Sequence, residues 1–140
     1  AVNALALDAS AAASLVLPDE KSDAVARVLE GLPELARIVV PALWWYELAN
    51  VLALAVRRGR IKEADSIRAW NLLCALEPVS DARAGPIHGL ELVELAGRHG
   101  LSAYDAAYLE LAMRTGAPLC TLGGPLRDAA ERAGVRVVPD

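Results

Sequence analysis

Three acidic residues lie in segments that are otherwise apolar. Asp8 ends an apolar run, Glu47 interrupts an apolar helical segment, and Asp105 lies near the start of a third apolar segment. A carboxylate beside buried surface is costly unless it is paired, hydrogen-bonded or bound to a metal. Because these three acids come from distant parts of a chain of 140 residues, we predict that they converge on a site for a hard divalent cation such as Mg²⁺.

A divalent cation held by carboxylates favours hydrolysis of a phosphodiester bond, because the ion activates water and stabilises charge on the phosphate. We therefore interpret Asp8, Glu47 and Asp105 as both the catalytic and the metal-binding residues of a metal-dependent nuclease. Ser10 would orient Asp8, a water or a phosphate, since no Ser-His-Asp partners for a nucleophilic serine are evident. Asn50 lies one helical turn after Glu47 and is expected to be a second contact near the metal or the substrate.

Each acid also has a purely structural alternative. Asp8 could cap the helix that follows it, although Ser10 lies closer to the expected helix start. Glu47 could lie on a solvated helix edge. The alternative is strongest for Asp105, because Ser102 and Asp105 match the helix-opening pattern [ST]-x-x-[DE], in which the acid serves the first turn. Spacing alone leaves both interpretations open. Tyr104 and Tyr108 are expected to pack in the core or at its rim.

The composition is that of one globular domain, residues 1–140, with a hydrophobic content of 55% and no repeat or low-complexity segment. A net charge of -4 does not indicate nucleic-acid binding, but carboxylates of a metal site count as negative until a cation neutralises them. Basic residues gather after the Glu47 helix, and the simplest interpretation is a helix C-terminus enriched in cations. They are Arg57, Arg58, Arg60 and Lys62.

The remaining metal-binding residue types form no recognisable motif. Cys74 and Cys120 are far apart, and we expect two buried, reduced thiols of a cytosolic protein. His88 and His99 lack zinc-ligand spacing. No uninterrupted apolar run approaches the roughly 18 residues of a membrane span, and Asp8 argues against a signal peptide. We therefore expect a cytoplasmic protein without a membrane segment.

Short apolar strands alternate with helices along the chain. Strands are expected at 2–7, 37–40, 77–79, 118–122 and 135–138, and helices at 11–17, 19–30, 43–58, 63–76, 84–99, 102–115 and 125–133. This alternation predicts an α/β fold with a mainly parallel sheet covered on both faces. Such folds bind ligands at the carboxyl ends of their strands. Asp8 and the turn at 122–124 both lie at such ends.

Four segments, taken in order, carry these residues. They are Leu7-Asp8-Ala9-Ser10, then Val40-Pro41-Ala42-Leu43 leading into Glu47-Leu48-Ala49-Asn50, then Leu101-Ser102-Ala103-Tyr104-Asp105-Ala106-Ala107-Tyr108-Leu109, and finally Leu119-Cys120-Thr121-Leu122. In this order they resemble the PIN domain, and most closely the VapC-type toxins of prokaryotic toxin–antitoxin modules. The resemblance runs from about residue 5 to residue 138.

The resemblance implies a three-layer α/β/α sandwich and an endoribonuclease that depends on Mg²⁺ or Mn²⁺. It also implies a homodimer, RNA as the substrate, and inhibition by a cognate antitoxin protein. By the same match, Asp8, Glu47 and Asp105 would bind the metal. Ser10, Asn50 and Thr121, which lie in the matching segments, would be supporting polar residues near the metal.

One position departs from the family pattern. A fourth acid often follows the threonine by two residues, and here that position is Gly123. Three carboxylates still suffice for one Mg²⁺, which keeps several waters, so the expectation is either hydrolysis with a single metal or reduced activity. The alternative is a catalytically weakened domain that acts by binding RNA or an antitoxin-like partner. The turn Gly123-Gly124-Pro125 could expose N–H groups to a phosphate, or be a plain strand-to-helix turn.

Overall fold

The computed structural model describes residues 3–19 and 22–140. Its strands form one sheet in the order β3-β2-β1-β4-β5, and each neighbouring pair is parallel. The strands are β1 (Ala4–Leu7), β2 (Arg37–Pro41), β3 (Val79–Asp81), β4 (Leu119–Cys120) and β5 (Val137–Val138). The predicted parallel sheet is confirmed.

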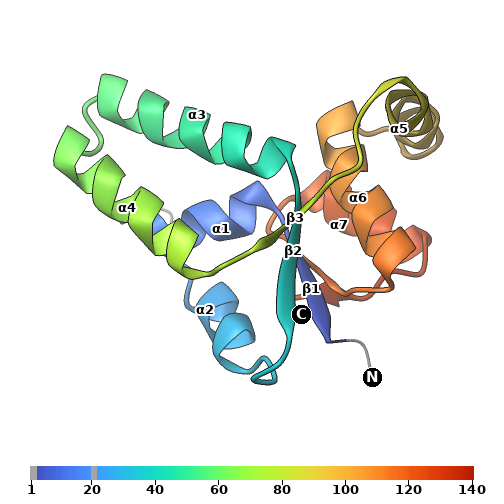
Figure 1. Ribbon diagram of the computed structural model, residues 1–140, viewed down its shortest axis with the longest axis horizontal. Helices are drawn as coiled ribbons and strands as arrows, with labels where there is room; N and C mark the ends of the chain where they lie inside the picture. The colour runs from blue at the N-terminus through green and yellow to red at the C-terminus, as the bar shows by residue number, and fades with distance from the viewer. Residues whose placement is uncertain (1–2, 20–21) are drawn as a thin grey trace.

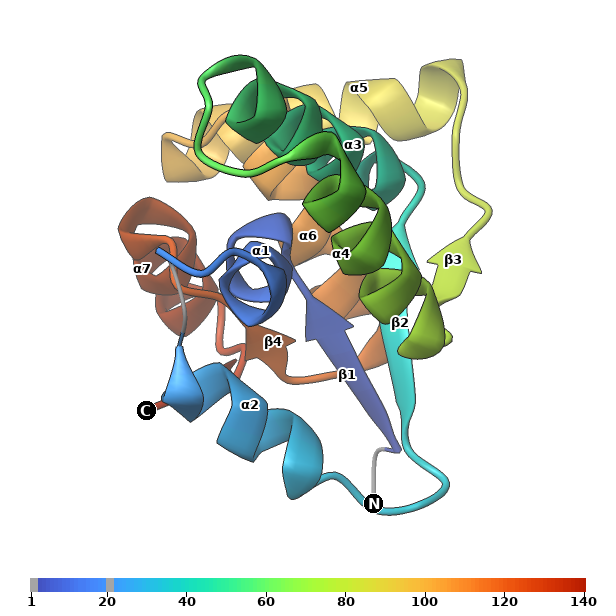
Figure 2. The ribbon, with the colours of Figure 1, turned by 90° about the vertical axis from the view of Figure 1, so that its left-hand side faces the viewer.

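Helices cover both faces of this sheet. They are α1 (Ala9–Val16), α2 (Asp23–Glu30), α3 (Leu43–Arg57), α4 (Glu63–Ala75), α5 (Pro86–His99), α6 (Ala103–Thr115) and α7 (Gly124–Arg132). Figure 1 shows the sheet nearly edge-on, with α1 to α4 on one side and α5 to α7 on the other. In Figure 2, α1, α2 and α4 lie in front of the strands. The result is the three-layer α/β/α sandwich that the resemblance implies.

The core forms where the central strand meets both helical layers. Leu5, Ala6 and Leu7 of β1 are buried, as expected for a parallel strand covered on both faces. On α3, Trp44 and Leu48 lie one turn apart and are fully buried, and the helix packs mainly against α1 and α4 and less against β2.

The order in which strands are added to the sheet reverses at β1. The chain crosses from β1 to β2 on one side, whereas β4 pairs with the other side of β1, with Leu7 opposite Cys120. At this point the backbone N–H of Asp8 donates to the carbonyl of Cys120 over 3.0 Å. Ligands of open α/β sheets bind at such a switch point, outside the carboxyl ends of the strands. Asp8 and Thr121 follow the two strands that meet here.

Several expected element boundaries were wrong. Strands β4 and β5 are shorter than expected, and α5 begins at Pro86 and not at residue 84. Helix α1 begins at Ala9 because Asp8, not Ser10, is its N-cap. Strand β3 begins at Val79, two residues later than expected, because Glu77 adopts a φ of 50° that no strand accommodates. Helix α2 begins at Asp23 behind its N-cap Ser22. The expected start at 19–21 falls partly on residues 20 and 21, outside the described residues.

The expectation of two buried thiols was half right. Cys120 is buried in β4, where burial, as the main cause, raises the thiol pKa to about 12. Cys74, in contrast, is exposed, because it lies on the outer side of α4. Within the described ranges, no helix combines the length and the apolar character needed to cross a membrane.

Candidate active site

Asp8 is held by donors on both of its carboxylate oxygens. Oδ1 accepts the Ser10 hydroxyl at 2.7 Å and the backbone N–H of Ala11 at 2.9 Å, while Oδ2 accepts the Thr121 hydroxyl. Only 5% of Asp8 is exposed. Asp8 therefore caps α1 from the carboxyl end of β1, beside the end of β4. Its role as a metal ligand stays a prediction.

Thr121 connects the end of β4 to Asp8. It is fully buried, and its hydroxyl donates to Asp8 and accepts the backbone N–H of Gly123 at 3.0 Å. Ser10 makes a parallel connection, because its oxygen accepts the N–H of Leu122 at 3.2 Å. Two of the three predicted supporting residues, Ser10 and Thr121, thus join the β1 end to the β4 loop. They also use the N–H groups of residues 122 and 123, so the Gly-Gly turn serves as a strand-to-helix turn.

Glu47 projects from α3 toward the same edge of the sheet and is half-buried. Its Oε1 accepts the hydroxyl of Tyr108 over 2.6 Å. Tyr108 comes from α6 and is only 2% exposed. The predicted core or rim position is correct for Tyr108 and wrong for Tyr104, which is exposed. The sequence did not predict that the Tyr108 hydroxyl bonds to Glu47. The available signal was its place three residues after Asp105, on the same face of α6.

Asp105 lies in the first turn of α6, where its backbone N–H donates to the Ser102 hydroxyl at 3.1 Å. Ser102 is thus the N-cap, as the helix-opening pattern predicts. Among the described residues, none donates a hydrogen bond to the Asp105 carboxylate, so the acid does not complete a reciprocal capping box. The half-buried carboxylate is therefore free to share a cation with Asp8 and Glu47.

All three acids have a raised pKa, and neighbouring acids contribute to it for Asp8 and Glu47. Burial is the largest cause for each, and it raises the pKa of Asp8, Glu47 and Asp105. The charge of Asp105 raises the pKa of both other acids further, whereas the hydroxyl of Thr121 on Asp8 and that of Tyr108 on Glu47 act in the opposite direction. The ion pairs found in residues 3–19 and 22–140 include none of the three. A cation would relieve this uncompensated negative charge.

The spacing of the acids limits how a cation could be held. No choice of one oxygen each from Asp8, Glu47 and Asp105 brings all three pairs within 4.8 Å. The ligand oxygens of an octahedral Mg²⁺ lie at most about 4.2 Å apart, twice the metal–oxygen distance. At least one acid would reach the ion through water or after a side-chain rotation. Mg²⁺ suits such a site, because it usually retains several waters.

A second group of metal-binding side chains lies between α5 and α6. The ligand atoms of His88, Glu91 and Glu110 lie within 4.8 Å of one another. However, Arg83 already occupies this group, with Nη1 at 3.0 Å from Glu110 Oε1 and 3.4 Å from Glu91 Oε2. A guanidinium at that place repels a cation, and Arg114 adds a second positive charge on Glu110 at 2.7 Å. We interpret this group as an ion-pair network that joins the two helices.

Asn50 and Gly123 border the acids without contacting them. Asn50 is exposed and lines a groove of about 410 Å³ together with Ser10 and Glu47. Gly123 is the N-cap of α7 with an ordinary φ of -79°. A Cβ placed there would lie 3.5 Å from Thr121 Oγ1, a normal contact. The position of the missing fourth acid therefore accepts a side chain and faces the threonine that holds Asp8.

Comparison with known proteins agrees with this architecture. The family model described as PIN domain matches residues 5–132. The chain is 34% identical over 139 residues to Ribonuclease VapC3 of Pyrobaculum aerophilum, covering 96% of this chain and 98% of the relative. The crystal structure of PAE2754 from the same organism superposes with a TM-score of 0.68 at 25% identity, covering 96% of this chain and 83% of that one.

A more distant structure shares the fold. The crystal structure of FitAcB from Neisseria gonorrhoeae superposes with a TM-score of 0.66 at 17% identity, and the match covers 96% of both chains.

Proposed function

Because the chain belongs to the PIN-domain family and resembles its VapC-type ribonucleases over nearly its whole length, we propose that it is a metal-dependent endoribonuclease. It would hydrolyse phosphodiester bonds in RNA in the cytoplasm, as the toxin of a type II toxin–antitoxin module. The observation that carries the proposal is the meeting of Asp8, Glu47 and Asp105 at the switch point of the sheet. Their charges interact there, and the described chain offers no cation to pair with them.

In this proposal the three acids hold Mg²⁺ or Mn²⁺, directly or through water. The ion, when bound, supplies a Lewis acid that activates water and stabilises charge on the phosphate. The chain's own residues divide the remaining work. Asp8 is immobilised by the hydroxyls of Ser10 and Thr121, which sets the position of the negative charge. Asp105, with no donor from the described chain, keeps both oxygens free to orient the attacking water.

We further propose that the protein forms a homodimer. Helix α5 presents a row of exposed apolar side chains at three-residue spacing, formed by Ile87, Leu90 and Val93. Side chains spaced in this way share one face of a helix, and an exposed apolar face is typical of an interaction surface. A cognate antitoxin is the other proposed partner. Exposed Ile67 and Leu72 on α4, on the opposite side of the sheet, support a separate surface for it.

A second candidate function follows from Gly123. If three acids hold the ion too weakly, the same domain would bind RNA or an antitoxin-like partner without turnover. The position is open to a side chain, so the missing acid is a property of this sequence and not of a blocked site. Restoring the acid with Gly123→Asp separates the two functions, because a large gain in cleavage would show that the native site is impaired.

The direct test is cleavage of total RNA by purified, partner-free protein with Mg²⁺ or Mn²⁺, beside EDTA. We expect cleavage that EDTA abolishes and that Asp105→Asn reduces to background. Asp128→Asn is the matched control, because Asp128 is an exposed acid on α7 and its loss changes the net charge equally. Cleavage by Asp105→Asn at the wild-type rate would reject the assignment. Absence of cleavage by folded wild type would favour the binding function.

A further inference from the structure

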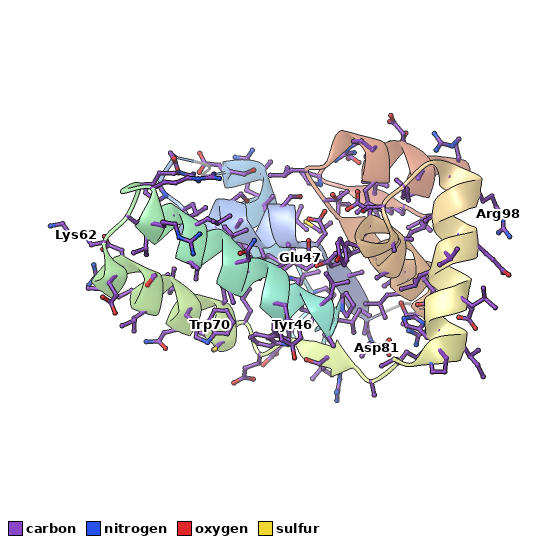
Figure 3. The ribbon with its side chains drawn as sticks, turned by 90° about the horizontal axis from the view of Figure 1, so that it is seen from above. Tyr46, Glu47, Lys62, Trp70, Asp81 and Arg98 are labelled. Atoms are coloured by element: carbon purple, nitrogen blue, oxygen red, sulfur yellow. The ribbon has the colours of Figure 1, made fainter. Side chains whose placement is uncertain are left out.

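A groove leads from the acids along α3 to its C-terminal end. Its volume is about 410 Å³, and Glu47 lies at one end with Arg58 and Arg60 at the other. Helix α1 forms the opposite wall. Figure 3 shows α3 running from Glu47, near the centre of the molecule, toward the loop that contains Lys62. The groove therefore extends outward from the active site across the upper surface.

The groove follows one face of α3. Glu47, Asn50, Leu54 and Arg58 are separated by three, four and four positions and all line it. Residues at this spacing share a helix face. Eleven residues of α-helix separate the carboxylate from the arginine, a rise of about 16 Å. The α1 wall consists of small side chains, Ala9, Ser10 and Ala13.

The arginines near the end of α3 differ in their partners. Arg60 is held in a two-pronged contact by Asp19, at 2.8 and 2.9 Å. Arg58 is exposed and has no ion pair with the described part of the chain. Arg57 is equally exposed, but it does not line the groove. A helix C-terminus favours cations, and Arg57 and Arg58 both satisfy that preference. The preference therefore does not account for the position of Arg58 beside the groove, which Arg57 does not share.

An RNA strand cut internally must continue on both sides of the scissile phosphate, and this groove offers one exit. Its acidic end would bind a phosphate only through a cation, whereas its basic end binds a phosphate directly. Asn50 lies between them with an exposed amide that donates and accepts. The charges thus match a polyanion that is bridged by metal at one end and by arginine at the other.

We propose that the α1–α3 groove holds the single-stranded RNA adjacent to the scissile phosphate, with Arg58 as a phosphate-binding residue about 16 Å of helix rise beyond Glu47. The inference rests on the proposed ribonuclease function and adds the path of the substrate. It assigns Asn50 to this strand and Arg60 to a structural role that fixes the end of the groove through Asp19.

The test compares Arg58→Ala with Arg57→Ala, a matched control that removes the same charge from the same turn. Both are made in the Asp105→Asn protein, and binding of an oligouridine long enough to reach Arg58 is measured by fluorescence anisotropy at several salt concentrations. We expect Arg58→Ala to weaken binding about tenfold, as for loss of one charge-assisted hydrogen bond. The slope of log affinity against log salt should fall by about 0.7. Arg57→Ala should change the affinity by no more than about twofold and should leave the salt slope unchanged.

A second measurement uses substrate length in the cleaving protein. A short oligouridine that cannot reach Arg58 should be cut equally well by wild type and Arg58→Ala, whereas a long one should show a raised KM in the variant. Equal behaviour of the two arginine variants, or an equal loss on short and long substrates, would overturn the proposal. Competition by polyglutamate as strong as that by RNA would also overturn it, in favour of protein docking.

The outcomes separate this inference from the function on which it rests. RNA cleavage by wild type, together with identical affinities for the two arginine variants, would reject the groove and leave the ribonuclease intact. Failure of wild type to cleave RNA and of the Asp105→Asn protein to bind it would reject both.

Discussion

The hydroxyl of Tyr108 donates a 2.6 Å hydrogen bond to Oε1 of Glu47 and so joins α6 to α3 above the sheet. The phenol is buried, and burial together with the neighbouring carboxylate raises its pKa, so it remains a proton donor. Asp8 is held in a similar way by Thr121. Two of the three acids are therefore oriented by hydroxyl groups from other elements, which leaves Oε2 of Glu47 for other contacts.

Replacing Tyr108 by Phe should weaken metal binding by roughly tenfold, as for loss of a residue that orients a metal ligand. The hydrogen bond from Tyr108 lowers the pKa of Glu47, so its loss makes protons compete more strongly with the metal. We expect the Mn²⁺ concentration for half-maximal thermal stabilisation to rise, and the pH profile of cleavage to shift to higher pH. Tyr104→Phe is the control, because Tyr104 lies on the same helix with its side chain exposed. Identical Mn²⁺ titrations for the two variants would contradict this role.

In the metal-free protein, Asp8, Glu47 and Asp105 should destabilise the fold as pH rises above their ordinary pKa range. The folded-state pKa values of Asp8, Glu47 and Asp105 are raised above their ordinary values of 3.8, 4.5 and 3.8. Their stabilising contribution is complete below those ordinary values and is lost as pH rises through the raised ones. Asp105→Asn should therefore have a higher Tm than wild type at pH 7 in EDTA, with a difference that shrinks toward pH 4.

The comparison with Asp105→Asn is needed because other carboxyl groups, such as Asp65, have a lowered pKa and give the opposite slope. Differential scanning calorimetry across this range measures both proteins. Added Mg²⁺ at pH 7 should raise the Tm of wild type more than that of the variant. A Tm difference that does not change with pH would show that Asp105 does not carry the repulsion.

Replacing Thr121 by Val should destabilise the protein by about 2 kcal/mol, because a buried acceptor and a buried donor lose their partner. The substitution keeps the shape of the side chain but removes the bonds to Asp8 and to the N–H of Gly123. Urea denaturation at pH 7 gives the change. Thr115→Val is the control, since Thr115 is an exposed residue whose hydroxyl bonds to the Leu111 carbonyl of α6 and to the N–H of Ala117 just after it. An equal effect of both substitutions would argue against a special role for the Thr121 contact.

Gly123→Asp should increase metal affinity by roughly tenfold or more and increase the cleavage rate with it. The backbone accepts a side chain without strain, and the new Cβ meets Thr121 Oγ1 at 3.5 Å. Gly124→Asp is the control, because it adds the same charge next door, where a Cβ meets no atom within 4 Å. Isothermal titration with Mn²⁺ and a cleavage assay measure both effects. Unchanged cleavage despite tighter binding would mean that three acids already suffice.

Much of the fold could be predicted because its signals are local. The alternation of apolar strands and helices predicted the parallel sheet. Capping residues marked several helix boundaries, as Ser102 does for the start of α6. The errors also have local causes. Asp8 competes with Ser10 as N-cap, and the positive φ of Glu77 delays β3. The three acids were recognisable because a carboxylate in an apolar segment needs a partner.

The sequence by itself thus determined which elements form and which charged residues require compensation, since both depend on residue type and short-range periodicity. Only the tertiary structure decided which partners those residues meet. Tyr108 reaches Glu47 across 61 positions and Thr121 reaches Asp8 across 113. Arg58 and Arg60 both line the groove, and Arg60 is hydrogen-bonded there to Asp19. Such pairings depend on how helices pack against the sheet, and packing joins residues irrespective of their separation along the chain.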